Sequence, residues 1–387
     1  MNGRWPPEAV NALLALLHEL QRGCLALWQA LGLGTPLHGQ PAWPWAWRLA
    51  GEMLVLDAGH LRRVVLTLAC LLLAALLLGL SAFWRRARKP LWGIALALLL
   101  LAPWPDAGLL WAPAVPTSLH ASPTGFTAQG IARGAGVYRQ HCVRCHGEDG
   151  RGEGPDAASL PMWPPTLNGA LLWKRLDGEL FWRVRHGLQA RDGQRTMPGF
   201  ADRLSDTQVW EVLDYLQAHA AGRMLQQGGA WNVPVRVPDT GLRCRGGRQH
   251  TARSLQAQGQ RLLLVLPGPG AALPAEDPRL VTVQVGPGAG TDPECRTDDP
   301  DMPAALALLL GVGLGEGPGH QVLVDRAGWL RARSRPGQPG WSDSDLVCRS
   351  TTSPTALAPA PAGDGLGSLI RRMDAEPVQL VRGGFPH

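Results

Sequence analysis

The sequence predicts a multi-domain chain: an α-helical membrane anchor, then a small all-α domain, then an α/β region. Three observations carry this prediction. Residues 64–84 are nearly uncharged and long enough to cross a membrane. Apolar residues recur at spacings of three and four over 127–141 and 205–219, as expected of two packed helices. Short apolar runs at 261–266 and 280–285 have the length of strands and precede a helical stretch.

The composition indicates several units rather than one uniform core. The chain has 387 residues, and its 48 glycines and 34 prolines supply turn and linker material for two or three units. The net charge of +6 is modest and partly concentrated in one cluster, which argues against a nucleic-acid-binding surface. Seven cysteines are too few and too scattered for a disulfide scaffold.

Residues 1–112 are predicted to form a membrane anchor with two or three transmembrane helices. At about 1.5 Å per residue, the run 64–84 covers a hydrocarbon core of about 30 Å. A second apolar run begins at residue 91. The run 10–33 has polar residues in its middle and leaves two interpretations open, a membrane helix with a polar side toward a partner or an interfacial amphipathic helix.

A basic cluster between the two clear apolar runs sets the expected orientation. Basic loops favour the cytoplasmic side of a membrane, so the run from residue 91 should exit to the other face. Everything after about residue 112 is therefore predicted to be exported, on the periplasmic side of a bacterial inner membrane. The cluster consists of Arg85, Arg86, Arg88 and Lys89.

The chemistry-bearing motif lies at the end of the first helix of the all-α domain. Cys142 and Cys145 are separated by two residues, and His146 follows at once. This spacing lets two thiols add to the vinyl groups of one haem while the imidazole binds its iron. A zinc half-site would need another close-spaced ligand pair, and a thioredoxin-type redox pair lacks the trailing histidine. The motif therefore predicts one covalent haem c, attached where bacteria carry out this attachment, on the exported side.

Helix signals surround this motif. A helix is expected over 127–141, and a second over 205–219, where Ser205 caps the N-terminus and Gln208 completes a capping box. A short helix at 177–186 should stop at Gly187. Residues 197–200 read as a turn before the last helix.

Residues 127–219 resemble a class I mono-haem cytochrome c, in which an N-terminal helix crosses a C-terminal helix through a glycine and aromatic residues. The resemblance implies that Met197 is the distal ligand of the haem iron and His146 the proximal one. It also implies that the carbonyl of Pro164 or Pro165 accepts a hydrogen bond from the proximal imidazole. The residues at the places of the helix crossing are Gly134, Tyr138, Tyr215 and Leu216.

A narrower resemblance, carried by the segments 115–126, 131–134 and 178–182, is to cytochromes fused behind a CopD-like copper-resistance membrane domain. The anchor has fewer apolar runs than a full CopD-like region and reads as a remnant of one. Copper is accordingly an unsupported partner. The histidines that could bind it share no close spacing, as a metal site would require. They are His18, His38 and His60.

After a predicted glycine-rich linker at 220–232, residues 233–335 have a βαβ-type order that resembles a thioredoxin-like redoxin domain. At the place of the family's cysteines, directly after the strand 261–266, the chain reads Pro-Gly-Pro-Gly, so this domain lacks the active-site thiols. Residues 336–387 are expected to be a mostly irregular tail. Three cysteines remain, enough for one disulfide and one free thiol: Cys244, Cys295 and Cys348.

Together these features predict a membrane-anchored electron-transport protein, more a carrier or redox subunit than a stand-alone enzyme. The haem domain is expected at 125–221 and its partners to be redox proteins, a membrane oxidoreductase on one side and a periplasmic donor or acceptor on the other. Two alternatives stay open. One is a copper-homeostasis membrane protein that uses the haem in metal reduction or transport; the other is a haem subunit of a larger oxidoreductase complex.

Overall fold

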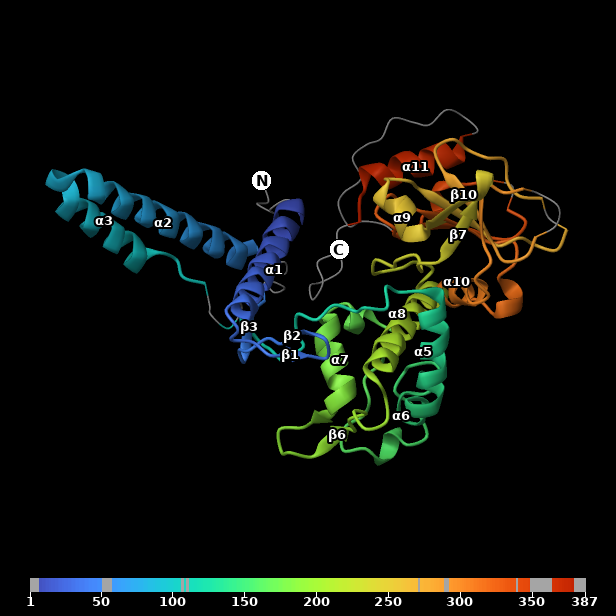
Figure 1. The fold of residues 1–387 in the computed structure, drawn as a ribbon, viewed down its shortest axis with the longest axis horizontal. Helices are drawn as coiled ribbons and strands as arrows, with labels where there is room; N and C mark the ends of the chain where they lie inside the picture. Colours follow the sequence, from blue (N-terminus) through green and yellow to red (C-terminus); the bar gives the residue numbers. More distant parts are fainter. Residues whose placement is uncertain are drawn as a thin grey trace. The chain divides into compact units, whose positions relative to one another are not determined.

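Figure 1 shows the computed structural model of the chain, which describes residues 7–50, 58–105, 108, 111–270, 272–288, 292–338, 340–348 and 364–378. The chain divides into two compact units, which are described separately. The first comprises residues 1–35 and 41–116. The second comprises residues 36–40 and 117–387.

The first unit contains the predicted anchor. Helix α1 spans Pro7–Ala30, α2 spans Ala58–Phe83, and the turn η2 (Arg85–Ala87) leads into α3 (Arg88–Leu101). Strands β3 (Trp47–Leu49) and β4 (Trp111–Pro113) pair antiparallel. Among the described residues, one helical stretch, Arg62–Phe83, is long and apolar enough to cross a membrane.

Helices α2 and α3 form a hairpin, visible in blue to teal in Figure 1. Two side-chain contacts hold it: the Trp92 indole N–H donates to the Ser81 hydroxyl at 2.9 Å, and the Thr67 hydroxyl donates to the Pro103 carbonyl at 2.9 Å. The 14 residues of α3 span about 21 Å at 1.5 Å each, less than a hydrocarbon core of about 30 Å. The number of transmembrane helices thus stays a prediction.

The second unit begins with a helical domain. Helix α5 (Ala128–His141) leads into α6 (Val143–His146), and α7 (Asp177–His186) precedes the hairpin of β5 (Leu188–Gln189) and β6 (Arg195–Met197). Helix α8 (Asp206–Gly228) follows. The predicted signals are confirmed: Ser205 and Gln208 form the capping box of α8, and α7 ends at Gly187.

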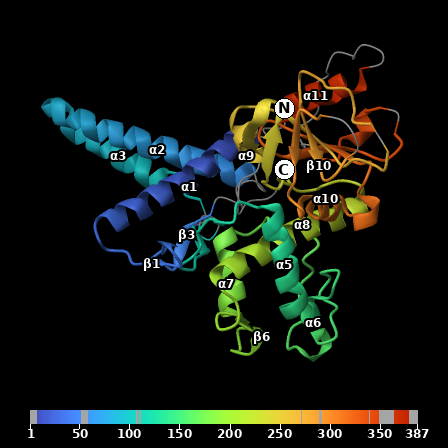
Figure 2. The ribbon, with the colours of Figure 1, turned by 45° about the vertical axis from the view of Figure 1, so that its right-hand side comes forward.

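Helices α5 and α8 cross closely, as Figures 1 and 2 both show. A Cβ at Gly134 would lie 2.0 Å from the carbonyl oxygen of Glu211, so only glycine permits this approach. The rings of Tyr138 and Tyr215 lie 5.2 Å apart beside the crossing. The predicted glycine and aromatic contact between these helices is confirmed.

A seven-stranded sheet forms the rest of the unit, in the order β13-β12-β9-β10-β11-β7-β8. Its central strands β9, β10 and β11 run parallel, and the flanking neighbours are antiparallel. The strands are β7 (Gly241–Cys244), β8 (Arg248–Thr251), β9 (Leu262–Val265), β10 (Val281–Val285), β11 (Cys295–Thr297), β12 (Gln321–Val324) and β13 (Leu330–Ser334). The helices are α9 (Ala252–Ala257), α10 (Met302–Leu310) and α11 (Gly365–Ala375).

The predicted linker at 220–232 is wrong over most of its length. Helix α8 continues to Gly228, and Leu225 and Trp231 are buried. A Cβ at Gly222 would lie 1.9 Å from the Leu308 carbonyl oxygen, so α8 packs directly on α10. The small residues of this stretch resemble a linker in composition, but they allow α8 and α10 to come close together. One continuous apolar core therefore runs from the helical domain into the sheet.

The expectation of an irregular tail is wrong for Gly365–Ala375, which forms α11. Its apolar residues Leu369, Ile370 and Met373 are buried against one face of the sheet, next to Leu263 and Leu323. The helix is short, and the sequence on either side of it is rich in proline, glycine and threonine. For this reason its apolar periodicity was not recognised in the sequence.

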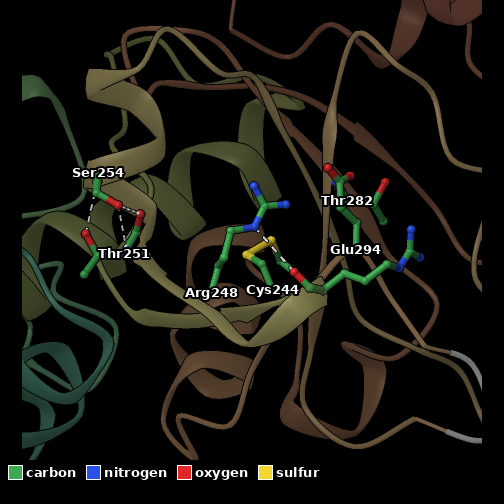
Figure 3. Close-up of a disulfide and its surroundings, with 8 residues drawn as sticks. Cys244, Arg248, Thr251, Ser254, Thr282 and Glu294 are labelled. Carbon is green, nitrogen blue, oxygen red and sulfur yellow. Dashed lines mark hydrogen bonds between the residues drawn. A yellow bond between two sulfur atoms is a disulfide. The ribbon is translucent and has the colours of Figure 1, made fainter.

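The structure also pairs the cysteines of this region. Cys244 and Cys295 are opposite each other on β7 and β11 and form a disulfide, shown in Figure 3. Cys348 is free and buried. The predicted division into one disulfide and one free thiol is confirmed.

Candidate functional site

The helical domain contains an apolar crevice, and the residues predicted to hold a haem all line it. Cys142, Cys145, His146 and Met197 contribute to its wall. The remaining wall is largely aliphatic, including Leu160, Leu171, Leu180, Val184, Val212 and Leu216. Segments from α5 to α8 thus converge on one cavity that excludes polar groups from most of its surface.

The two thiols lie where α5 gives way to α6. Cys142 is the C-cap of α5 and Cys145 lies within the single turn of α6. Burial raises the pKa of the Cys142 thiol to about 12, and it also raises the pKa of Cys145. Redox-active and metal-binding cysteines have lowered pKa values. Protonated thiols in an apolar wall therefore do not fit a thioredoxin-type redox pair.

A zinc site is not supported either. Zinc takes four ligands from cysteine, histidine or carboxylate side chains. The described part of the chain brings together no group of three such residues. The described histidines that could bind copper are not gathered into such a group either. The Nδ1 of His38 lies 2.9 Å from the Asp206 carboxylate, and its ring lies 5.2 Å from that of Phe181. His18 belongs to the other unit, and the side chain of His60 lies outside the described residues.

His146 ends α6, and its side chain is partly buried. Burial lowers its pKa, and the carbonyl of Pro165 opposes this by raising it, so the imidazole stays neutral at neutral pH, as a metal ligand must be. Its Nδ1 is buried and has no hydrogen-bond partner. Pro165 is the proline whose carbonyl influences the ring. Between the two prolines left open by the sequence, this contact favours Pro165.

A glycine keeps the proline loop beside this ring. A Cβ at Gly152 would lie 2.2 Å from the carbonyl oxygen of Pro164. The φ of Gly152 is +87°, a conformation that side chains disfavour. Any other residue here would displace the loop that carries Pro165.

Three residues compete in sequence for the distal position, and the structure separates them. Met197 ends β6, is partly buried against the core and lines the crevice. Met162 also lines it but is 57% exposed. His186 is exposed and does not line the crevice; its ring lies against that of Trp182, with the centroids 3.8 Å apart and the planes tilted. Gly187 fixes the neighbourhood of Met197, because a Cβ there would lie 2.4 Å from the Met197 carbonyl oxygen.

Two crevice residues carry roles that sequence reasoning missed. The Tyr138 hydroxyl donates to the carbonyl of Gly147 at 2.7 Å and so holds the loop that follows His146. Arg183 is the cation of the crevice wall; burial and the neighbouring Arg175 lower its pKa. Its place in the helical pattern of α7 looks like a solvent-facing charge, so only the fold reveals it.

The donor set fits a covalently attached haem. The crevice offers two thiols for thioether bonds, a neutral imidazole, a thioether sulfur and an aliphatic lining. The half-buried Arg183 guanidinium suits a cofactor that brings carboxylates.

Residues 129–216 match the family model described as cytochrome C oxidase, cbb3-type, subunit III. The helical region is thus a c-type cytochrome domain, which implies covalently bound haem c and electron transfer through it. No curated protein of similar sequence was found. A chain of the Kuenenia stuttgartiensis reducing HAO-like protein complex Kustc0457/Kustc0458 is 24% identical, with a TM-score of 0.22. That match covers 32% of this chain and 58% of the other, so this chain spans little more than half of that neighbour's length.

Proposed function

We propose that the protein is a membrane-anchored electron carrier that transfers single electrons through one covalently bound haem with His146 and Met197 as axial ligands. The observation that carries the proposal is the convergence of four residues, Cys142, Cys145, His146 and Met197, on one apolar crevice. The first three are adjacent in sequence, whereas Met197 reaches the same wall only through the fold.

Each residue has a distinct part in this proposal. A bound haem supplies reversible one-electron chemistry at its iron. Cys142 and Cys145 would hold the haem covalently, His146 would offer a neutral imidazole nitrogen to its iron, and Met197 would offer a soft sulfur that favours ferrous iron. The aliphatic wall excludes water and disfavours the additional charge of the oxidised state.

The proposed anchor is the hairpin of α2 and α3. Large apolar side chains cover it and remain exposed, among them Leu72 at 72%, Phe83 at 85% and Leu101 at 82%. Such a surface is costly in water and suits lipid. The basic residues at its turn favour the cytoplasmic side, which would leave the haem domain in the periplasm.

For the sheet we propose a thioredoxin-like core that has lost its thiol chemistry. The order β13-β12-β9-β10, with α10 between β10 and β12, supports this. The described residues between β9 and β10 form no helix and carry no cysteine. This region would then serve to support the haem domain and to present surfaces to redox partners, rather than to exchange disulfides.

The test is the exchange Met197→Ala in protein matured with its haem. Loss of the thioether should abolish the weak near-infrared sulfur-to-iron charge-transfer band, lower the midpoint potential and let carbon monoxide bind the reduced haem. Met162→Ala is the matched control, because Met162 lines the same crevice from an exposed loop. His186→Ala is the second control.

Both controls should keep the band and the potential. An unchanged spectrum in Met197→Ala would contradict the ligand assignment. So would loss of the band in His186→Ala with Met197 intact.

A further inference from the structure

Helix α1 carries a stripe of leucines that stays open in the described part of the chain. Leu16, Leu20 and Leu27 share one face, because residues four and seven positions apart lie on the same side of a helix. Their side chains are 55%, 55% and 62% exposed. The sequence alone leaves α1 as either a spanning or an interfacial helix, and the contacts of its other sides decide between the two.

Away from this stripe, α1 is polar and is attached to a strand. The buried Gln21 side chain makes two hydrogen bonds with the backbone of Leu49 in β3. Its amide group donates to the Leu49 carbonyl at 3.1 Å, and its side-chain carbonyl accepts from the Leu49 N–H at 2.8 Å. One position further, the exposed Arg22 pairs with Glu19 at 2.7 Å. The middle of α1 is therefore fixed at the level of β3.

Strand β3 does not suit the hydrocarbon core of a membrane. Among the described residues, β3 and β4 form a sheet of two strands, whose outer edges no further strand covers. Lipid tails offer no hydrogen bonds to such edges, so open edges do not occur within the bilayer core. β3 also contains Arg48, whose charge is costly at that depth. Leu49, and Gln21 with it, must lie at or outside the membrane surface.

A helix fixed there by Gln21 is too short to cross the membrane in either direction. At 1.5 Å per residue, α1 extends about 21 Å from Gln21 back to Pro7 and about 14 Å forward to Ala30. The hydrocarbon core is about 30 Å thick. An orientation in the plane of the surface is the one that still brings the leucine stripe into contact with lipid.

Exposed tryptophans gather around the same strand pair. Indoles concentrate at the membrane–water interface, which accommodates both the apolar ring and its N–H group. Strand β3 precedes α2 and β4 follows α3, so both strands lie on the side of the hairpin away from its basic turn. The exposed indoles in these strands and in the segments beside them are Trp45, Trp47, Trp104 and Trp111.

We propose that α1 lies along the periplasmic surface of the membrane, with Leu16, Leu20 and Leu27 inserted at the boundary between headgroups and acyl chains. The indoles around β3 and β4 would occupy the same boundary, and Arg22 and Gln29 would face water. The described chain would then cross the membrane twice, in α2 and α3. The inference rests on the proposed membrane anchor and adds a second contact of that anchor with lipid.

The test measures how deep a fluorescent probe lies in the bilayer. The full chain, matured with its haem, is reconstituted into phosphatidylcholine vesicles after its free thiols Cys24 and Cys70 have been replaced by serine. A nitrobenzoxadiazole probe is attached to one new cysteine in each variant. Phosphatidylcholine brominated near the headgroup end of the acyl chain, or near its far end, quenches probes at the corresponding depth.

Two matched pairs of positions separate the faces of α1. Headgroup-end bromine should quench Leu20→Cys and Leu27→Cys equally, and at least about twofold more than chain-end bromine, because an interfacial helix inserts only about 5–10 Å. Arg22→Cys and Gln29→Cys, the same distance apart on the polar side, should be quenched by neither. Leu76→Cys, at an exposed position in the middle of α2, is the anchor control and should be quenched most by chain-end bromine.

Two results would overturn the inference while the control at Leu76 still supports the anchor. Quenching at Leu20 mainly by chain-end bromine would show that α1 spans the membrane. No quenching at Leu20 and Leu27 would show that water or another protein covers the stripe. If the probe at Leu76 is itself not quenched, the proposed anchor fails and the inference fails with it.

Discussion

The cytochrome domain and the sheet region each contain a pair of cysteines, and the two pairs differ in every respect. Cys142 and Cys145 are close in sequence, free and part of a cavity wall. Cys244 and Cys295 are 51 residues apart and joined across adjacent strands. The second pair links two strands of the sheet, whereas the first pair lines the crevice. The difference marks the first region as the place of chemistry and the second as a support.

Two arginines repeat this contrast. Arg331 is fully buried, and its guanidinium donates to Asp325 and to the carbonyls of Cys348, Met373 and Glu376. Arg183 lines the haem crevice, and the described part of the chain holds no ion pair to it. The fold itself supplies the partners of the buried Arg331, whereas the partly exposed Arg183 keeps donors for a ligand in the crevice.

The largest effect on stability is expected at Arg331. Arg331→Ala leaves Asp325 and three carbonyls without their buried donor, which should lower the free energy of unfolding by about 3–5 kcal/mol. Urea-induced unfolding followed by tryptophan fluorescence measures it. Arg183→Ala and the exposed control Arg335→Ala should each change it by less than about 1 kcal/mol. A larger loss of unfolding free energy for Arg183→Ala than for Arg331→Ala would contradict the assignment of Arg331 as the stabilising cation.

Removal of the disulfide comes next. The double change Cys244→Ser and Cys295→Ser opens a 51-residue separation and should cost about 2–4 kcal/mol, because the unfolded chain regains freedom. The haem absorption spectrum should not change. Loss of haem attachment in this variant would mean that the second pair takes part in the chemistry.

Two glycines test close helix contacts, Gly134 within the cytochrome domain and Gly222 between that domain and α10 of the sheet region. Gly134→Ala and Gly222→Ala each force a Cβ against a backbone carbonyl of a neighbouring helix and should cost about 1–3 kcal/mol or more. Gly136→Ala is the control in α5, since a Cβ there meets no atom within 4 Å; it should stabilise by up to about 1 kcal/mol. If Gly222→Ala proved harmless, α8 and α10 would not be in close contact.

The smallest effect is expected at the start of α8. Ser205→Ala removes the acceptor of the Gln208 N–H and should cost about 1 kcal/mol, read from the thermal midpoint of the haem domain. Asp202→Ala, an exposed change outside the helix, serves as the control and should have no measurable effect. Equal thermal midpoints for the two variants would show that the Ser205 cap does not stabilise α8.

Local signals in the sequence predicted much of this structure. The signals for α5, α7 and α8 are capping residues, stop glycines and apolar spacing, all of which involve residues close together in the chain. The first residue of each helix and the last residue of α7 were therefore predictable from the sequence to within one residue. The attachment motif is equally local, since three of its residues lie within five positions. Met197 was predicted through a family resemblance, and its place in the crevice wall depends on how β6 folds back.

Long-range features could not be read in the same way. The continuation of α8 past residue 219 depends on Gly222 meeting α10, about 90 positions away in the chain. The partner of Cys244 depends on strand register, which places Cys295 directly opposite. The hydrogen bonds of Arg331 depend on which carbonyls and carboxylates the fold brings near it. Composition alone contains none of this information.

The most direct test of the central claim is the fate of the haem under denaturing conditions. Protein matured with haem-attachment machinery should keep its haem through acid-organic extraction and show the mass of the chain plus one haem, because thioether bonds survive where coordination bonds fail. Replacing both Cys142 and Cys145 with Ser should release all haem, while the Cys244 and Cys295 double variant should retain it. Haem that passes from the unchanged protein into the organic phase would contradict the account.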